Sequence, residues 1–318
     1  MTSIITNLLT PNQSDGGDTL NPELLTPNQK TGTDTLGDTT GFDKAGANTI
    51  ISSSTEQAHT GTKSLKATTN GDGPNEGIWT TTTTVTPHTT YIAGAWVYAP
   101  TGTKMRIALY DGNNNLAYTD FTATGTWQWI EQNITTDTDT TLKIGIRTNG
   151  IYKINFYTDD LSLTKNDTTG FNVVNSATLS ISPYTSYQGY RSLKVVTPGS
   201  VVGEGTYLPI TITGYTSYSE SIKIKAPVDA TIQLSLHSAG GAKLNGSTIV
   251  TGTGDWQEVV LEDIEALSTD DTFRIYIRTI TSAQDITFYV DQSMLETGSK
   301  AHDWIIGKGS YSFFRSRE

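Results

Sequence analysis

The chain has 318 residues, a formal net charge of −11 and no cysteine, and only 17% of its residues are charged. The length suits about two domains, and the lack of cysteine excludes disulfides and thiolate chemistry. The sequence contains no run of about 18 apolar residues, the length needed to span a membrane. The excess of acidic residues disfavours a nucleic-acid partner. Fifteen tyrosines, six tryptophans and abundant threonine favour an all-β protein, because such side chains suit a half-buried pleated surface.

The N-terminal 40 residues contain a duplication. The motif Leu-Leu-Thr-Pro-Asn-Gln stands at residues 8–13 and again at 24–29, sixteen residues later. A unit of that size cannot bury a core of its own. We therefore expect residues 1–40 to form an arm that docks on a larger module or on a neighbouring subunit.

A longer repeat, with a period of about 130 residues, covers most of the remaining chain. Matching blocks recur in the same order, among them 64–66 with 192–194, 124–128 with 253–257, 144–148 with 275–279, and 154–159 with 286–291. The repeat predicts two copies of one module, residues 41–166 and 170–299, followed by a C-terminal tail, residues 300–318. The aromatic and basic tail suggests docking into a partner, and the alternative is that it folds back on the second module.

Within each copy, apolar residues alternate with polar ones over short stretches. In the first copy these stretches are 91–98, 105–110 and 142–147, and in the second they are 232–236 and 273–277. Alternation of this kind, with turn residues between the stretches, predicts antiparallel strands. The fold class is all-β, with two tandem antiparallel β-sandwich modules and no helix of ten residues or more.

The spacing of several motifs resembles the jelly-roll carbohydrate-binding modules of the family four and nine type. The motifs are Gly-Thr-Lys-Ser-Leu-Lys at 61–66, the strand 91–99, Gly-Thr-Trp-Gln at 125–128, and Phe-Tyr-Thr-Asp-Asp-Leu-Ser-Leu at 156–163. The end of the second copy, residues 288–305, is similar to modules of bacteriophage structural proteins. The resemblance implies jelly rolls, and implies the ligand class only weakly, because many such modules are structural.

The resemblance also implies a structural Ca²⁺ ion in each module. It would be bound by Asp159 or Asp291, at equivalent positions of the two copies, together with backbone carbonyls near Lys63 and Arg191. Calcium prefers six to eight oxygen ligands. The alternative interpretation, an aspartate that caps a turn, stays open.

The first copy places aromatic and basic residues on the predicted outward faces of its strands. Exposed aromatic rings with charged neighbours are typical of sugar-binding sites. We therefore predict that Trp96, Tyr98, Tyr110, Arg106 and Arg147 form a glycan-binding platform. The alternative is that these aromatic residues pack against loops or a protein partner.

The second copy has lysines where the first has Trp96 and Tyr98. Lysine is seldom buried unpaired, so this face is predicted to point to solvent in both copies. We expect Lys223, Lys225, Arg274 and Arg278 to bind an anionic surface, either an acidic polymer or an acidic patch of another subunit. The alternative is an ordinary solvated face.

No catalytic motif stands in the sequence, and the four histidines do not cluster with acids, so we expect a non-enzymatic protein. The leading hypothesis is a bacteriophage virion accessory protein that contacts other virion proteins, forms a homo-oligomer and binds host-surface polysaccharide. It would lie on the virion surface and become extracellular after lysis, since no export signal begins the chain. The alternative is a tandem carbohydrate-binding fragment of a secreted polysaccharide-degrading enzyme or an adhesin.

Overall fold

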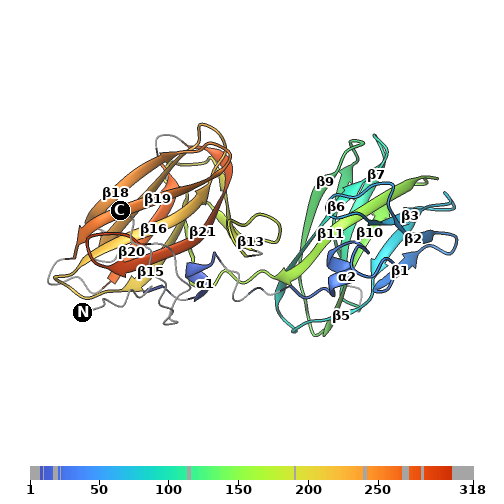
Figure 1. The fold of residues 1–318 in the computed structure, drawn as a ribbon, viewed down its shortest axis with the longest axis horizontal. Coiled ribbons are helices and arrows are strands. Elements are labelled where there is room, and N and C mark those ends of the chain that lie inside the picture. The colour runs from blue at the N-terminus through green and yellow to red at the C-terminus, as the bar shows by residue number, and fades with distance from the viewer. Residues whose placement is uncertain are drawn as a thin grey trace. The chain divides into compact units, whose positions relative to one another are not determined.

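The computed structural model describes residues 8–9, 11–16, 21, 23–112, 116–189, 191–238, 241, 243–266, 272–280 and 283–302. The chain divides into two compact units. The first, module 1, comprises residues 22–166. The second, module 2, joins residues 1–21 to residues 167–318. Each is nearly all β-structure (Figure 1).

Module 1 is a sandwich of two antiparallel sheets, named here after a residue on the outer face of each. The strand order of the Trp79 sheet is β1 (Phe42–Ala45), β4 (Gly77–Thr80), β10 (Thr141–Thr148), β7 (Lys104–Tyr110) and β8 (Leu116–Thr122), and β5 (Thr83–Thr84) also pairs with β10. The order of the Trp96 sheet is β2 (Ile50–Ser54), β3 (Ser64–Thr68), β11 (Asn155–Lys165), β6 (Thr90–Tyr98) and β9 (Gln128–Thr135).

Module 2 repeats this architecture. The Tyr207 sheet has the order β12 (Asn172–Val174), β15 (Gly205–Thr211), β20 (Thr272–Thr279), β17 (Thr231–Ser238) and β18 (Lys243–Thr251). The Lys223 sheet has the order β13 (Thr178–Ser182), β14 (Ser192–Pro198), β21 (Asp285–Thr297), β16 (Ser217–Lys225) and β19 (Trp256–Glu265). The predicted fold class, two tandem antiparallel sandwiches, is confirmed.

The alternation seen in the sequence decides which side chains enter each core. Ile107 of β7 and Ile146 of β10 are fully buried between the sheets of module 1, as is Ala95 of β6. Successive side chains of a strand point to opposite faces. The residues between them, such as Arg106, Arg147 and Trp96, therefore point outward. Knowing which residues of a strand enter the core therefore identifies the residues on its outer face.

The duplicated N-terminal motif forms two short segments, cap 8–16 (residues 8–16) and cap 24–32 (residues 24–32). They contain the one-turn helices α1 (Pro11–Ser14) and α2 (Pro27–Lys30). In α2, Thr26 and Gln29 exchange hydrogen bonds in a capping box, which explains why a helix starts at this motif.

The two caps belong to different modules. Helix α2 packs against β11 of module 1, and α1 packs against β21 of module 2 (Figure 1). This differs from the expected single arm, because the first copy of the motif is part of module 2. Module 2 is therefore discontinuous in sequence, because residues 22–166 of module 1 separate its two segments along the chain.

The start of the predicted tail folds onto module 2. Lys300 forms an ion pair with Glu262 at 3.0 Å, and the His302 backbone N–H donates to Glu296. The rest of the predicted tail, residues 303–318, lies outside the described residues. In the described part of the chain, no helix is long and apolar enough to cross a membrane.

Candidate functional site

The five residues predicted to form one glycan-binding platform lie on two different sheets. Trp96 and Tyr98 lie on β6 of the Trp96 sheet, whereas Arg106 and Tyr110 lie on β7, and Arg147 on β10, of the Trp79 sheet. Both sets point away from the core that separates the sheets. The predicted platform is therefore divided between two opposite outer faces. The prediction treated strands that follow one another in sequence as neighbours, but here they belong to different sheets.

The outer face of the Trp79 sheet carries a row of residues across four strands. The pairing register places Trp79 opposite Gly145, Gly145 opposite Ala108, and Ala108 opposite Tyr118. A Cβ atom on Gly145 would lie 2.6 Å from Cζ3 of Trp79. The indole therefore occupies the space left by the missing side chain, lying over Gly145.

A second row on this face is charged. Arg147 lies opposite Arg106, which in turn lies opposite Asp120. The Arg147 guanidinium is 4.4 Å from the centre of the Trp79 ring, and that of Arg106 is 3.7 Å from the centre of the Tyr118 ring. Arg106 also donates two hydrogen bonds to Asp120, at 2.6 and 2.9 Å. Both arginines are held in place by these rings.

The charges on this face influence one another. The hydrogen bonds from Arg106 lower the pKa of Asp120, so this carboxylate is ionised near neutral pH. Burial, together with the positive charge of Arg106, lowers the pKa of Arg147. The Arg147 Nε atom is buried and has no hydrogen-bond partner among the residues the structure describes. The face thus combines aromatic rings with two arginines and an ionised carboxylate.

Sequence reasoning identified Arg106, Tyr110 and Arg147 on this face but missed Trp79 and Tyr118. The Trp79 ring lies 6.1 Å from that of Tyr110, centre to centre. A signal for Trp79 was present, because it follows Glu76-Gly77, a pair that recurs as Glu204-Gly205 with Tyr207 at the equivalent place. An aromatic residue is thus kept at this position in both copies.

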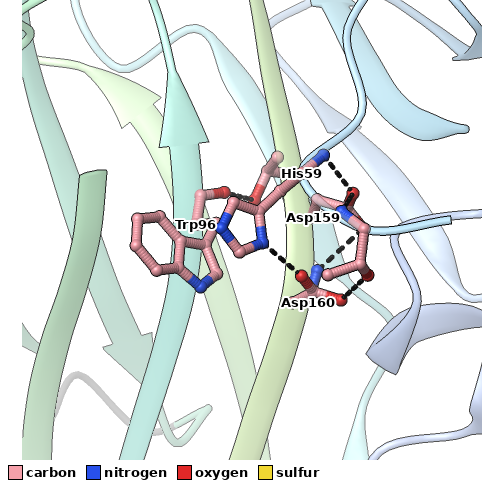
Figure 2. A network of polar contacts seen from close by, with 6 residues as sticks. His59, Trp96, Asp159 and Asp160 are labelled. Atoms are coloured by element: carbon pink, nitrogen blue, oxygen red, sulfur yellow. Dashed lines mark hydrogen bonds and ion pairs between the residues drawn. The ribbon is translucent and has the colours of Figure 1, made fainter. Parts of the chain in front are cut away.

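The Trp96 sheet presents a different aromatic face. The ring of His59, from the loop before β3, stacks on Trp96 with centres 3.9 Å apart and an interplanar angle of 16°. The ring of Trp129 lies 6.0 Å from that of Trp96 on the neighbouring strand, and that of Trp127 lies 5.8 Å from that of Tyr98. Trp96 points outward, as predicted, but His59 covers one of its faces (Figure 2).

Two adjacent aspartates on β11 hold the loop that carries His59. The backbone N–H groups of His59 and Thr60 donate to Asp159 at 2.9 and 3.3 Å, and the Asp160 N–H donates to its other oxygen at 2.8 Å. The carboxylate of Asp160 contacts His59 Nδ1 at 2.6 Å (Figure 2). Asp159 therefore anchors the loop through its backbone.

Asp291 makes the equivalent contacts in module 2. It accepts the N–H groups of Tyr187 and Gln188 on one oxygen, and that of Gln292 on the other. Burial raises its pKa to about 7, against the effect of these hydrogen bonds. Burial, with a contribution from Asp160, likewise raises the pKa of Asp159 to about 7.

These surroundings do not fit the expected Ca²⁺ ligands. Calcium needs several converging oxygens. Three backbone N–H groups point at each carboxylate, with their positive ends where a cation would sit. Among the described residues, no group of three or more His, Asp or Glu side chains is arranged so that it could hold a metal ion. The geometry fits the alternative role that the sequence left open, an aspartate that fixes a loop.

The four basic residues predicted to form one anionic-surface site in module 2 also lie on two sheets. Lys223 and Lys225 lie on β16, and Arg274 and Arg278 lie on β20 of the Tyr207 sheet. The ammonium of Lys223 lies 3.7 Å from Glu258 and 4.7 Å from the centre of the Tyr187 ring. Lys223 is thus already paired within its own module.

The arginines of module 2 lie among tyrosines. The guanidinium of Arg274 is 5.0 Å from the ring centre of Tyr207, and that of Arg278 is 4.9 Å from the ring centre of Tyr276. The two tyrosine rings lie 5.3 Å apart. Arg278 and Tyr207 occupy the positions of Arg147 and Trp79 in module 1, so both modules combine an aromatic ring with an arginine on the same sheet.

Comparison with known proteins links module 1 to a family. Residues 30–150 match the family model described as a carbohydrate binding domain. The match covers less than half of the chain. Most of module 1 is therefore similar in sequence to carbohydrate-binding domains. No curated protein sequence matches the chain.

Solved structures of carbohydrate-binding modules are similar to this chain at low identity. The N-terminal tandem of two family 22 modules of Paenibacillus barcinonensis Xyn10C has 16% identity and a TM-score of 0.37, covering 87% of this chain and 98% of that one. The C-terminal family 22 module of Clostridium thermocellum Xyn10B has 16% identity and a TM-score of 0.36, covering 43% of this chain and 91% of that one.

Proposed function

We propose that this protein binds carbohydrate without catalysis, and that the outer face of the Trp79 sheet is the glycan-binding face of module 1. The observation that carries the proposal is the row of Trp79 and Tyr118 flanked by Arg147, Arg106 and Asp120, within the segment that matches a carbohydrate-binding domain. Aromatic rings pack against the apolar CH faces of sugars, and charged groups bind their hydroxyls.

Each group on this face has a distinct role in the proposal. The Trp79 indole, supported from below by Gly145, offers a flat surface for a pyranose ring. Arg147, whose guanidinium lies over the Trp79 ring, donates hydrogen bonds, and the ionised Asp120 accepts hydrogen bonds from sugar hydroxyls. Arg106 is fixed by Tyr118 and Asp120, so it loses little side-chain entropy when a ligand binds.

The test compares single substitutions on the two faces of module 1. Trp79→Ala and Tyr118→Ala are expected to abolish or strongly weaken binding in a screen of soluble polysaccharides followed by calorimetry. Trp96→Ala, on the other sheet, is the matched control and should bind as the unmodified protein does. Loss of binding only in Trp96→Ala would overturn the choice of face, and no binding to any glycan would overturn the function.

For module 2, we propose that the Tyr207 sheet prefers an acidic saccharide. Arg278 donates to the neutral Gln233, at 3.4 and 3.3 Å, and Ile249 lies opposite Gln233, where in module 1 Asp120 lies opposite Arg106. The Tyr207 sheet therefore has no carboxylate at the position of Asp120 to offset the charge of its arginines. Arg278→Gln should reduce the affinity for a uronate-containing polymer and leave neutral glycans unaffected. An equal loss for both polymers would contradict the proposal.

The wider role we propose is that of a bacteriophage virion accessory protein that recognises polysaccharide on the host surface. Its support is the likeness of residues 288–305 to modules of phage structural proteins. Antibodies against the protein should label purified particles, and the purified protein should bind host cells. Host binding without any particle labelling would instead favour a carbohydrate-binding fragment of a secreted enzyme or an adhesin.

A further inference from the structure

Each module contains a site that binds a cap of the same sequence. The Leu8 N–H donates to the Leu295 carbonyl at 2.8 Å, and the Leu24 N–H donates to the Leu163 carbonyl at 2.9 Å. The next residue of each cap, Leu9 or Leu25, enters the core of its module, with 0% and 7% of its surface exposed. The caps thus enter their modules through the same backbone and side-chain contacts.

The amide side chains that follow make matching hydrogen bonds. In cap 8–16, Asn12 donates to the Thr169 carbonyl at 2.8 Å, and Gln13 donates to the Gly170 carbonyl at 2.9 Å. In cap 24–32, Asn28 donates to the Thr40 carbonyl at 2.8 Å, and Gln29 donates to the Gly41 carbonyl at 2.9 Å. All four amide residues are buried, so breaking one of these bonds would leave a buried polar group without its partner.

A glycine near the end of each cap packs on the last strand of its module. A Cβ atom on Gly16 would lie 2.7 Å from the Val290 carbonyl oxygen, and one on Gly32 would lie 2.8 Å from that of Thr158. Both glycines have positive φ angles, 64° and 53°. The two sites therefore select the same peptide, with two leucines, an Asn-Gln pair and a terminal glycine.

The two caps differ in how they are joined to their modules. Cap 24–32 precedes β1 of the same module by nine residues, from 33 to 41. Cap 8–16 is separated from the rest of module 2 by the whole of module 1, residues 22–166. Along the chain, cap 8–16 is therefore connected to its binding site only through the folded module 1. The contacts are the same whichever copy of the chain supplies the cap, and exchange of an identical element is a low-cost route to oligomers.

We propose that cap 8–16 is an exchangeable segment, and that the cap-binding site of module 2, formed by Thr169, Gly170, Val290 and Leu295, accepts this cap from a second copy of the chain. Copies joined in this way form dimers by mutual exchange. Intramolecular docking competes through its high effective concentration, so exchange increases where copies are crowded together.

Two full-length variants with complementary defects test the exchange. The first, Leu9→Ala with Asn12→Ala and Gln13→Ala, has a defective cap and an intact binding site. The second, Gly170→Val, has an intact cap and a blocked site, because a Cβ atom there would lie 2.7 Å from Cγ of Gln13 and the φ angle of 98° suits glycine. Each variant alone should be monomeric in mass photometry.

An equimolar mixture of the two variants should contain a species of twice the monomer mass. A mixture in which the Gly170→Val chain also carries Leu9→Ala should remain monomeric. A monomeric mixture in the first case would overturn the proposal, provided that both variants show the β-sheet circular dichroism of the unmodified protein.

A second measurement does not depend on the folding of any variant. Two unmodified chains with different tags, incubated together at high concentration near the unfolding temperature of module 2, should form mixed dimers that a sequential pull-down recovers. A synthetic peptide of residues 8–16 should suppress these dimers, and a scrambled peptide should not. Lack of mixed dimers under these conditions would also overturn the proposal.

Discussion

Replacing Gly145 by alanine should weaken glycan binding without touching any polar group on the proposed face. The added methyl would lie 2.6 Å from Cζ3 of Trp79, so the indole must move from its place over β10. A stacked aromatic contact contributes about 0.5–1.5 kcal/mol beyond the area it buries. Losing it reduces affinity by about two- to tenfold.

The Trp96 sheet offers a matched control for this substitution. A Cβ atom on Gly94 would lie 2.1 Å from Cζ2 of Trp129, so Gly94→Ala displaces a tryptophan in the same way on the other face. Overpacking costs about 1–3 kcal/mol in each case, offset by about 0.5–1 kcal/mol from replacing glycine in a strand. The two variants should therefore lose similar stability.

Calorimetric titration with the preferred glycan, alongside thermal unfolding, separates the two effects. Gly145→Ala should show the two- to tenfold loss of affinity, and Gly94→Ala should bind as the unmodified protein does. If Gly94→Ala loses affinity while Gly145→Ala retains it, the assignment of the binding face to the Trp79 sheet is refuted.

Three further predictions concern stability. Leu9→Ala should lower the free energy of unfolding of module 2 by about 2–5 kcal/mol, and Leu25→Ala should do the same to module 1 alone, as two transitions in calorimetry would show; a Leu9→Ala effect on module 1 would contradict the cap assignment. Burial raises the pKa of Glu220 to about 8, so the folded state holds a proton there that the unfolded state loses above about pH 4.5. Stability should therefore fall as the pH rises toward and through 8, and Glu220→Gln should flatten this melting-temperature profile; an unchanged profile would show that Glu220 ionises normally. A chelator should leave the melting temperature unchanged, whereas Asp159→Ala should lower the free energy of unfolding by about 3 kcal/mol, because three backbone N–H groups lose their acceptor; a chelator-dependent shift would restore calcium as a ligand of the aspartates.

Comparing the two modules distinguishes residues that maintain the fold from residues that could bind a ligand. Asp159 and Asp291 make the same backbone contacts in both modules, which identifies them as parts of the framework. The outer faces have diverged, since Trp96 corresponds to Lys223 and Gly145 to Tyr276. At the position shared by Trp96 and Lys223, a loop side chain makes the contact in both modules: His59 stacks on Trp96, and the ammonium of Lys223 lies over the Tyr187 ring.

The sequence by itself determined the module count, the fold class and the direction of most strand side chains. Such features follow from local patterns, because a period of two residues fixes the two faces of a strand and a repeated block order reveals a duplicated domain. On this basis Trp96, Arg106 and Arg147 were correctly placed outside the cores.

Only the tertiary structure decided which outward residues share a face and which cap belongs to which module. The strands β6 and β7 follow one another along the chain but lie in different sheets, so alternation alone could not separate Trp96 from Arg106. The caps are identical over six residues, and therefore no sequence signal distinguishes their binding sites. Strand pairing and cap docking depend on contacts between residues far apart in the chain, which local periodicity does not encode.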